Sequence, residues 1–166
     1  MRLLTLVRHA KSSWDDAKLS DFERPLNERG LRDAPVMAQW AARHLPASDR
    51  LISSPALRAI TTARVFAQAL GVAPAAILVQ PRIYEASADT LLNLLRGFDD
   101  ADGHVMLFGH NPGLSELALQ LGRCDFSNLP TCGLAHFSLK VKNWGEVTAD
   151  CGELRQYSFP KQQRSL

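Results

Sequence analysis

The sequence is short of cysteine, of net charge and of long hydrophobic runs, and each shortage excludes a class of protein. Its three cysteines show no Cys-x-x-Cys spacing, which argues against a disulfide framework or a zinc site and favours free thiols in a reducing compartment. A net charge of +2 is too small to indicate a nucleic-acid partner. No apolar run resembles a signal peptide or approaches the length that spans a membrane. We therefore expect a cytoplasmic protein without a membrane partner.

The remaining composition is that of an ordinary α/β protein. The 166 residues, 46% apolar and 22% charged, are in the usual range for one domain. We predict a single domain over residues 1–166, built as a three-layer sandwich with a mostly parallel central sheet flanked by helices. Residues 157–166 carry few core signals, so we expect a loosely held tail there.

Predicted strands and helices alternate along most of the chain. Strands are expected at residues 3–8, 51–53, 77–80, 104–108, 133–141 and 146–149, and helices at 27–45, 54–70, 87–98 and 114–121. Asn27, Ser54 and Ser87 are the expected N-caps. Pro35 should kink the first helix or delay its start. Strands followed by helices imply right-handed crossovers, and therefore parallel pairing.

Cationic and imidazole side chains follow three of these strands. Arg8 and His9 end the first strand, Arg58 lies in the first turn of the helix after the second, and His110 follows the fourth. The carboxyl ends of parallel strands meet at one edge of a sheet, so these side chains should converge. Two guanidinium groups and a helix N-terminus suit a phosphoryl dianion, and a neutral imidazole can attack phosphorus. The arginines would repel a metal cation, so we predict no metal and no cofactor.

Other candidate residues have simpler explanations. His44, His104 and His136 are expected to pack in the interior or lie on the surface. The long loop of residues 10–26 is expected to be functional, because loops of this length in compact domains usually are. Its Trp14 is either a substrate-facing aromatic or a hydrophobic anchor for the loop.

Three linked motifs resemble those of a known family. They are Val7-Arg8-His9-Ala10, the segment from Ser53 to Ala59 with Thr62-Ala63, and Gly109-His110-Asn111. Together they resemble the histidine phosphatase superfamily, which has the phosphoglycerate mutase-like fold. The short chain, the lack of a cap insertion, the Arg-His-Ala-Lys sequence and the loop from Asp21 to Leu26 make it similar to the small SixA-type phosphohistidine phosphatases.

The resemblance implies a role for each matching residue. His9 would attack phosphorus and carry a transient phosphoryl group, while Arg8, Arg58 and His110 bind the phosphoryl oxygens, with Asn111 as a further phosphate ligand. Glu85 falls where many members place the acid that protonates the leaving group. Its alternative is a solvated loop carboxylate.

Three functions remain open at this stage. The first is a metal-independent phosphatase that acts on phosphohistidine of a partner protein, the second is a phosphatase of a small phosphomonoester, and the third is a non-catalytic module that binds phosphorylated proteins. A loop of residues 10–26 that closes as a lid would favour the small substrate, whereas a shallow groove would favour the protein. We expect a monomer or a weak dimer.

Overall fold

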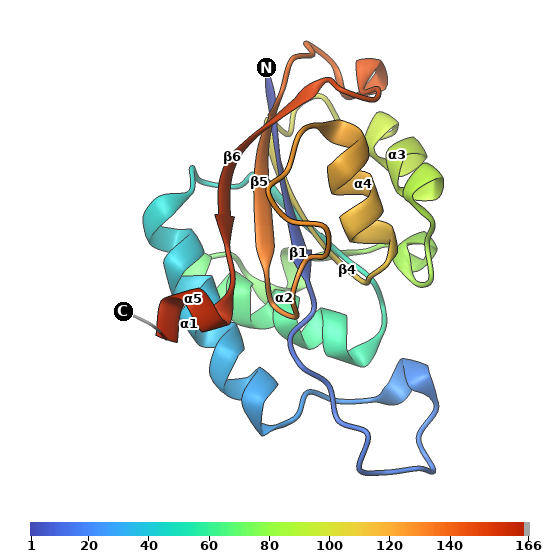
Figure 1. Ribbon diagram of the computed structural model, residues 1–166, viewed down its shortest axis with the longest axis vertical. Coiled ribbons are helices and arrows are strands. Elements are labelled where there is room, and N and C mark those ends of the chain that lie inside the picture. Colours follow the sequence, from blue (N-terminus) through green and yellow to red (C-terminus); the bar gives the residue numbers. More distant parts are fainter. Residues whose placement is uncertain (165–166) are drawn as a thin grey trace.

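Residues 1–164, which the computed structural model describes, form a six-stranded sheet with the strand order β3-β2-β4-β1-β5-β6. Parallel pairing joins β1 (Arg2–Arg8), β4 (His104–Gly109), β2 (Arg50–Ser53) and β3 (Leu78–Val79). Two antiparallel strands, β5 (Leu134–Leu139) and β6 (Gly152–Ser158), complete the other side (Figure 1). The predicted fold class, with a mostly parallel central sheet, is confirmed.

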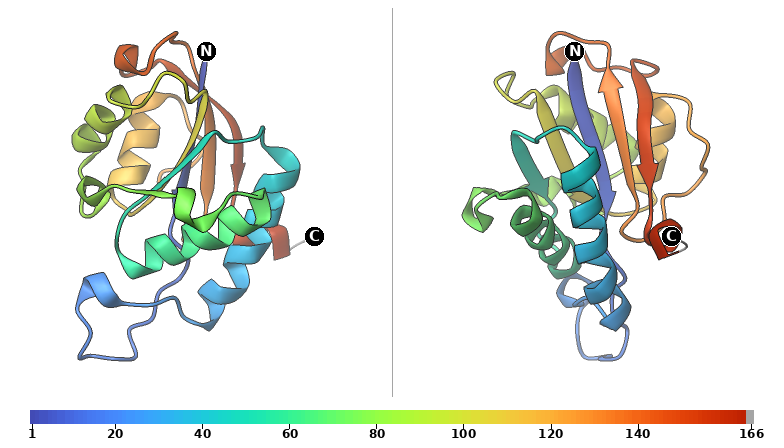
Figure 2. Two further views of the ribbon diagram at one scale, coloured as in Figure 1. Left: turned by 180° about the vertical axis from the view of Figure 1, so that it is seen from behind. Right: turned by 90° about the vertical axis from the view of Figure 1, so that its left-hand side faces the viewer.

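Helices cover both faces of the sheet. The helices α1 (Glu28–His44) and α2 (Leu57–Leu70) lie on one face, and α3 (Ala88–Arg96) and α4 (Gly113–Leu121) on the other (Figure 2). A short helix, α5 (Pro160–Arg164), follows β6. No helix within residues 1–164 is long and apolar enough to cross a membrane.

The central strand β1 is buried on both faces because its apolar side chains alternate between the two helical layers. Leu4 and Leu6 pack with the α3 and α4 layer, and Val7 packs with α1 and α2. All three side chains are fully buried. A strand covered on both sides is read from sequence as a nearly continuous apolar run, so the first predicted strand identified the centre of the sheet.

The first helix begins at the predicted residue, but the side chains that it buries differ in part from those predicted. The side chain of Asn27 accepts a hydrogen bond of 2.9 Å from the backbone N–H of Gly30, and Pro35 lies within α1 without delaying its start. Leu31, which the helical spacing placed toward the core, is 57% exposed. A side chain at Gly30 would collide with the backbone oxygen of Lys11. Glycine therefore allows α1 to pack against the segment that follows His9.

Two predictions near the C-terminus are wrong. Residues 146–149 form no strand, because the buried Trp144 donates from Nε1 to the Asp102 carbonyl at 2.8 Å and anchors a 3-10 turn, Trp144–Glu146. The tail is not loose from residue 157, since Tyr157 and Ser158 pair with β5. Arg164 contacts the carboxylate of Asp33 at 2.7 Å. Residues 165 and 166 lie outside the described residues.

The edge strand β3 is shorter than predicted. It contains only Leu78 and Val79 of the expected residues 77–80, and their side chains are 48% and 51% exposed. The strand pairs with β2 through two positions. As the edge strand, β3 has only β2 as a neighbour, so no second strand buries its side chains or extends the pairing.

Candidate active site

The ends of β1, β2 and β4 bring the predicted corners together at one edge of the sheet. Arg8 is in register with Gly109, and the backbone N–H of His9 donates to the Gly109 carbonyl at 3.0 Å. This pairing places His110 beside His9, with ring centroids 5.2 Å apart. The side chain of Arg58, in the first turn of α2, is also buried. The positive charges of Arg8 and Arg58 lower the pKa of both imidazoles.

The hydrogen bond of His9 determines which ring nitrogen can react. Nδ1 lies 2.7 Å from the carbonyl oxygen of Ala10. A carbonyl only accepts, so Nδ1 carries the proton and the lone pair of the neutral ring is on Nε2. Burial lowers the pKa of His9 from 6.5 to about 3, with further lowering from the charges of His110, Arg58 and Arg8. His9 is therefore a neutral imidazole at physiological pH, the form that can act as a nucleophile.

Ser54 orients the second histidine. Its Oγ accepts the N–H of Ala56 at 3.2 Å and lies 2.8 Å from Nε2 of His110. We assign the hydroxyl hydrogen to Nε2, which leaves the ring proton of neutral His110 on Nδ1. Burial, together with the charge of Arg58, lowers the pKa of His110 to about 4.

The contacts of Ser54 correct its predicted role as a helix cap. The helix α2 begins at Leu57, and Pro55 is not its first residue. The sequence indicated a helix cap at Ser54 because a serine before a proline is typical of a helix start. In the structure the Ser54 hydroxyl contacts His110 instead. Ser54 is instead a site residue that the sequence reasoning missed.

The arginines and His110 carry unpaired donors. Within the described part of the chain, four buried side-chain nitrogen or oxygen atoms have no hydrogen-bond partner, and three of them are Arg8 Nε, Arg58 Nε and His110 Nδ1. Each buried donor without a partner costs about 1–3 kcal/mol. The two arginine Nε atoms are N–H groups, and His110 Nδ1 is a third in the tautomer assigned above, so an anion with several oxygen atoms would satisfy them together.

Asp21, from the loop of residues 10–26, reaches Arg58. Nη1 of Arg58 donates to the Asp21 carbonyl at 2.6 Å, and Nη2 donates to its carboxylate at 2.9 Å. The same carboxylate accepts the hydroxyl of Tyr84 at 2.7 Å, and the Tyr84 ring meets His110 edge-on at 5.6 Å. The sequence singled out this loop by its length, its polarity and the SixA-type resemblance of residues 21–26, but it did not predict these contacts.

Glu85 is close to the site in sequence, but its side chain is exposed. It follows Tyr84 in a left-handed backbone conformation with φ of 56°, which is uncommon for a residue other than glycine. Gly113 allows this segment to approach α4, because a side chain at Gly113 would collide with the carbonyl of Ala86. The proton-donor role of Glu85 stays a prediction.

Asn111 has a different role from the predicted one. Its Nδ2 donates to Asn128 and to the carbonyl of Leu129, each at 2.9 Å, and its Oδ1 accepts from Ser115 at 2.7 Å. Both amide hydrogens are engaged by protein. The Leu129 carbonyl also accepts from Arg8 at 2.9 Å. Asn111 thus holds the loop that orients Arg8 and is not placed as a phosphate ligand.

The aromatic side chain of Trp14 anchors part of the long loop. The guanidinium of Arg24 lies 3.4 Å from the centre of its ring. Arg24 also donates to Ser12 at 2.8 Å and contacts Asp21 at 3.1 Å. Trp14 remains 72% exposed, so the ring covers Arg24 with one face and presents the other to solvent.

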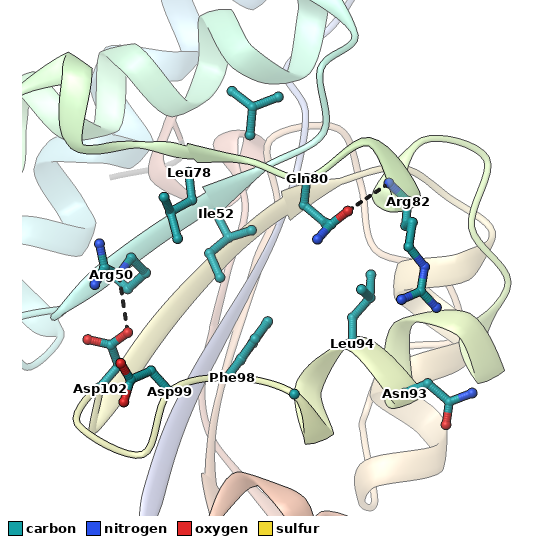
Figure 3. A pocket seen from close by; sticks show the side chains of 12 residues that line it. Arg50, Ile52, Leu78, Gln80, Arg82, Asn93, Leu94, Phe98, Asp99 and Asp102 are labelled. Atoms are coloured by element: carbon teal, nitrogen blue, oxygen red, sulfur yellow. Dashed lines mark hydrogen bonds and ion pairs between the residues drawn. The ribbon is translucent and has the colours of Figure 1, made fainter.

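One hollow borders the long loop of the site, and another lies along the β3 side of the sheet. One, of about 560 Å³, is lined mostly by apolar side chains of the long loop, of Pro55 and of α2, including Phe22 and Leu57, which neighbour Asp21 and Arg58 in sequence. A second, of about 510 Å³, runs along the β3 edge (Figure 3). It contains Gln80, Arg82 and the Arg50–Asp102 ion pair, and none of the predicted site residues.

Known proteins resemble this chain over nearly its full length. An uncharacterized protein of Mycobacterium tuberculosis is 30% identical over 165 residues, covering 93% of this chain and 100% of that protein. A solved structure from Agrobacterium tumefaciens, provisionally named the phosphohistidine phosphatase SixA, has a TM-score of 0.81 and 28% identity, and the match covers 96% of this chain and 98% of that one.

Two further matches complete the comparison. The protein histidine phosphatase SixA in complex with tungstate has a TM-score of 0.79 at 21% identity, covering 96% of this chain and 98% of that one, which shows the shared fold. The family model of the histidine phosphatase superfamily (branch 1) matches residues 4–96, more than half of the chain. The predicted fold and the assignment to the phosphatases are confirmed: the chain belongs to the histidine phosphatase superfamily.

Proposed function

We propose that this protein hydrolyses phosphohistidine on a partner protein through a phosphoryl group carried on His9. The observation that supports this most strongly is the set of three unpaired donors, Arg8 Nε, Arg58 Nε and His110 Nδ1, at the edge of the sheet where His9 presents a free Nε2. Charge-assisted donors of this kind stabilise the oxygens of a phosphoryl group during transfer.

The reaction has two steps. In the first, the Nε2 lone pair of His9 attacks phosphorus, the P–N bond to the substrate imidazole breaks, and that imidazole takes up a proton from solvent water as it leaves. Arg8, Arg58 and His110 donate to the oxygens that gain charge. In the second step, water attacks phosphorus, the bond to His9 breaks, and inorganic phosphate leaves with the neutral imidazole restored.

The surface around the site favours a protein substrate. The tip of the long loop, residues 14–18, is exposed and extends beyond the strand ends (Figure 1). The loop contacts the site through Asp21 and Phe22, which meet Arg58 and Tyr84. A phosphoryl site at the strand ends, bordered by an exposed loop, can receive a side chain that projects from a folded protein. The similar protein of A. tumefaciens is itself named for phosphohistidine.

The leaving group is a second argument for this substrate. Imidazole leaves phosphorus more readily than an alkoxide does, so a phosphohistidine substrate needs less help from a general acid. The one predicted acid, Glu85, is exposed in its loop. A small alkyl phosphate would depend on that residue much more strongly.

The test compares two substrates in the presence of a chelator. Purified protein is incubated with a histidine-phosphorylated phosphotransfer domain and, separately, with an aryl phosphate. We expect the phosphohistidine protein to be dephosphorylated with the larger kcat/KM, and the chelator to leave both rates unchanged. The matched control is His44→Ala, at the exposed end of α1, which should retain both activities. Efficient ester hydrolysis with no action on the phosphohistidine protein would reject the proposed substrate.

A further inference from the structure

One carboxylate connects three elements around the phosphoryl site. Asp21 lies in the 3-10 turn Asp21–Glu23 of the long loop. It receives hydrogen bonds from Arg58 of α2 at 2.9 Å, from Tyr84 at 2.7 Å and from Arg24 at 3.2 Å. Arg58 and Tyr84 are separated from Asp21 by 37 and 63 positions in sequence. The contacts therefore bridge segments that lie far apart in the sequence.

The bonds to Arg58 leave one particular edge of its guanidinium free. Asp21 occupies Nη1 with its carbonyl at 2.6 Å and Nη2 with its carboxylate at 2.9 Å. Nε is buried and unpaired. A guanidinium binds oxyanions along an edge made of two parallel N–H groups. With the Nη1 and Nη2 end held by Asp21, the Nε edge is the one presented to a phosphoryl group.

The hydrogen bond to Asp21 also holds the Tyr84 ring in place beside His110. The tyrosine hydroxyl donates to Asp21, and the ring packs edge-on against His110 at 5.6 Å. The hydrogen bond from Tyr84, followed by those from Arg58 and Arg24, lowers the pKa of Asp21 to about 2, so the carboxylate is ionised at neutral pH. The same bond raises the pKa of Tyr84 to about 12 and keeps its proton in place.

We propose that Asp21 is a positioning residue, which holds Arg58 and Tyr84 in the arrangement that binds the phosphoryl group. Asp21 does not touch phosphorus; it acts through the guanidinium of Arg58. The inference rests on the proposed phosphoryl site but not on the identity of the substrate. Failure to dephosphorylate a phosphohistidine protein would leave it standing.

The test uses Asp21→Asn with inorganic phosphate as the probe. Asparagine keeps the shape of the side chain and removes its charge. We expect the dissociation constant of phosphate, measured by calorimetry, to rise about tenfold, the loss typical of a charge-assisted hydrogen bond. The kcat/KM for an aryl phosphate should fall by at least as much. Asp15→Asn is the matched control, because Asp15 is an exposed carboxylate of the same loop, and it should change neither value more than twofold.

A double-mutant cycle separates positioning from a merely structural role. If Asp21 acts through Arg58, then Asp21→Asn should weaken phosphate binding less than twofold in an Arg58→Ala background. Asp21→Glu, which restores a carboxylate, should bind phosphate more tightly than Asp21→Asn. If Asp21→Asn does not fold, phosphate affinity is compared among wild type, Asp21→Glu and the double variant Tyr84→Phe with Arg58→Ala. An affinity of Asp21→Glu between the other two supports the proposal, and an affinity equal to that of wild type contradicts it.

Three outcomes would overturn the proposal. The first is tighter phosphate binding by Asp21→Asn, which would mean that the carboxylate repels the anion. The second is additivity of the two substitutions in the cycle. The third is a lower melting temperature with an unchanged dissociation constant, which is what loss of loop folding alone would produce.

Discussion

Two close pairs of histidines belong to the same sheet, one pair within its strands and the other just past the strand ends, and only one of them has the properties of a catalytic site. His9 and His110 have ring centroids 5.2 Å apart, and His104 and His136 are 5.0 Å apart. Burial is the main cause of a lowered pKa in all four. Proximity, burial and pKa direction therefore do not distinguish the pairs.

Hydrogen bonding does distinguish them. His104 donates from Nδ1 to the Ala47 carbonyl at 3.2 Å, so its Nε2 must accept the hydroxyl hydrogen of Thr5 at 2.7 Å. The oxygen of Thr5 then accepts from Nδ1 of His136 at 2.8 Å. This chain uses the hydroxyl of Thr5 as both donor and acceptor, and it makes the second pair a structural network.

The hydrogen-bonding groups around His9 and His110 are not all paired within the protein. His110 keeps an unpaired Nδ1, and the two neighbouring arginines keep unpaired Nε atoms. Unpaired buried donors beside a reactive lone pair identify a place that needs a ligand. The comparison shows that a functional histidine pair is recognised by nearby buried nitrogen atoms that have no hydrogen-bond partner in the protein.

The largest expected effect is that of His9→Ala. Removing the proposed nucleophile should lower kcat by at least about 10³-fold, because no second group within residues 1–164 presents a free imidazole nitrogen beside the same donors. Phosphate binding should change little. The matching change in the other pair, His136→Gln, should leave kcat per folded molecule within about twofold. Steady-state kinetics and phosphate calorimetry on both variants check the contrast, which fails if both lose turnover equally.

Arg58→Ala should have the next largest effect and a different signature. It removes a buried cation that, in the proposed mechanism, binds the phosphoryl group both before and during transfer. We expect kcat/KM to fall about 10²-fold and phosphate binding to weaken together with it. The same two measurements apply. Unchanged phosphate affinity would show that Arg58 does not face the anion.

Ser54→Ala should cost about tenfold in kcat/KM. The substitution frees Nε2 of His110 to take the ring proton, so Nδ1 loses the hydrogen that it offers to phosphate. Proton-detected NMR of the His110 ring, with and without phosphate, reports which nitrogen is protonated. A ring proton that stays on Nδ1 in the variant would contradict the orienting role of Ser54.

Thr5→Val should affect stability and spare activity. Valine has the same shape but leaves His104 Nε2 and His136 Nδ1 without their partner. We expect the free energy of unfolding, measured in urea, to fall by about 1–3 kcal/mol. The kcat per folded molecule should stay within about twofold of wild type. A loss of activity at unchanged stability would mean that the structural pair is coupled to the site.

The smallest effect near neutral pH is a change in the slope of stability against pH. In the folded protein the pKa of His136 is lowered from 6.5 to about 4, so between these values the unfolded chain binds a proton that the folded chain does not. Stability is therefore lost as the pH falls from about 6.5 to about 4. His136→Gln should reduce that slope by about one proton, or about 1.4 kcal/mol per pH unit. Urea titrations at several pH values measure it, and an unchanged slope would contradict the buried neutral state.

The centre of the fold and the convergence of Arg8, His9, Arg58 and His110 could be predicted because their signals are local. The apolar run that ends in Arg8 and His9 identified the central strand. His110 follows a strand directly and Arg58 lies in the first turn of the helix after a strand, so the parallel topology brings them to the same edge. Prediction succeeded where one short segment determines both the element and the position of its side chain.

The missed features depend on contacts between distant segments. Asp21 and Tyr84 meet across 63 positions, and only the packed fold determines that distance. The strand β6 has many polar residues and pairs with β5 on one side only, so its apolar alternation was too weak to detect. For Asn111, the motif identified the loop correctly, but a motif does not specify which partner a side-chain amide will bind.

The most direct test of the central claim is to trap the phosphoryl group. Wild-type protein is mixed with phosphohistidine protein or an aryl phosphate, quenched within the first turnovers under alkaline conditions that preserve phosphohistidine, and mapped by mass spectrometry. We predict a phosphoryl group on His9, absent from His9→Ala and absent from His104 and His136 in wild type. Turnover that continues in His9→Ala, or a phosphoryl group found on another residue, would contradict the account.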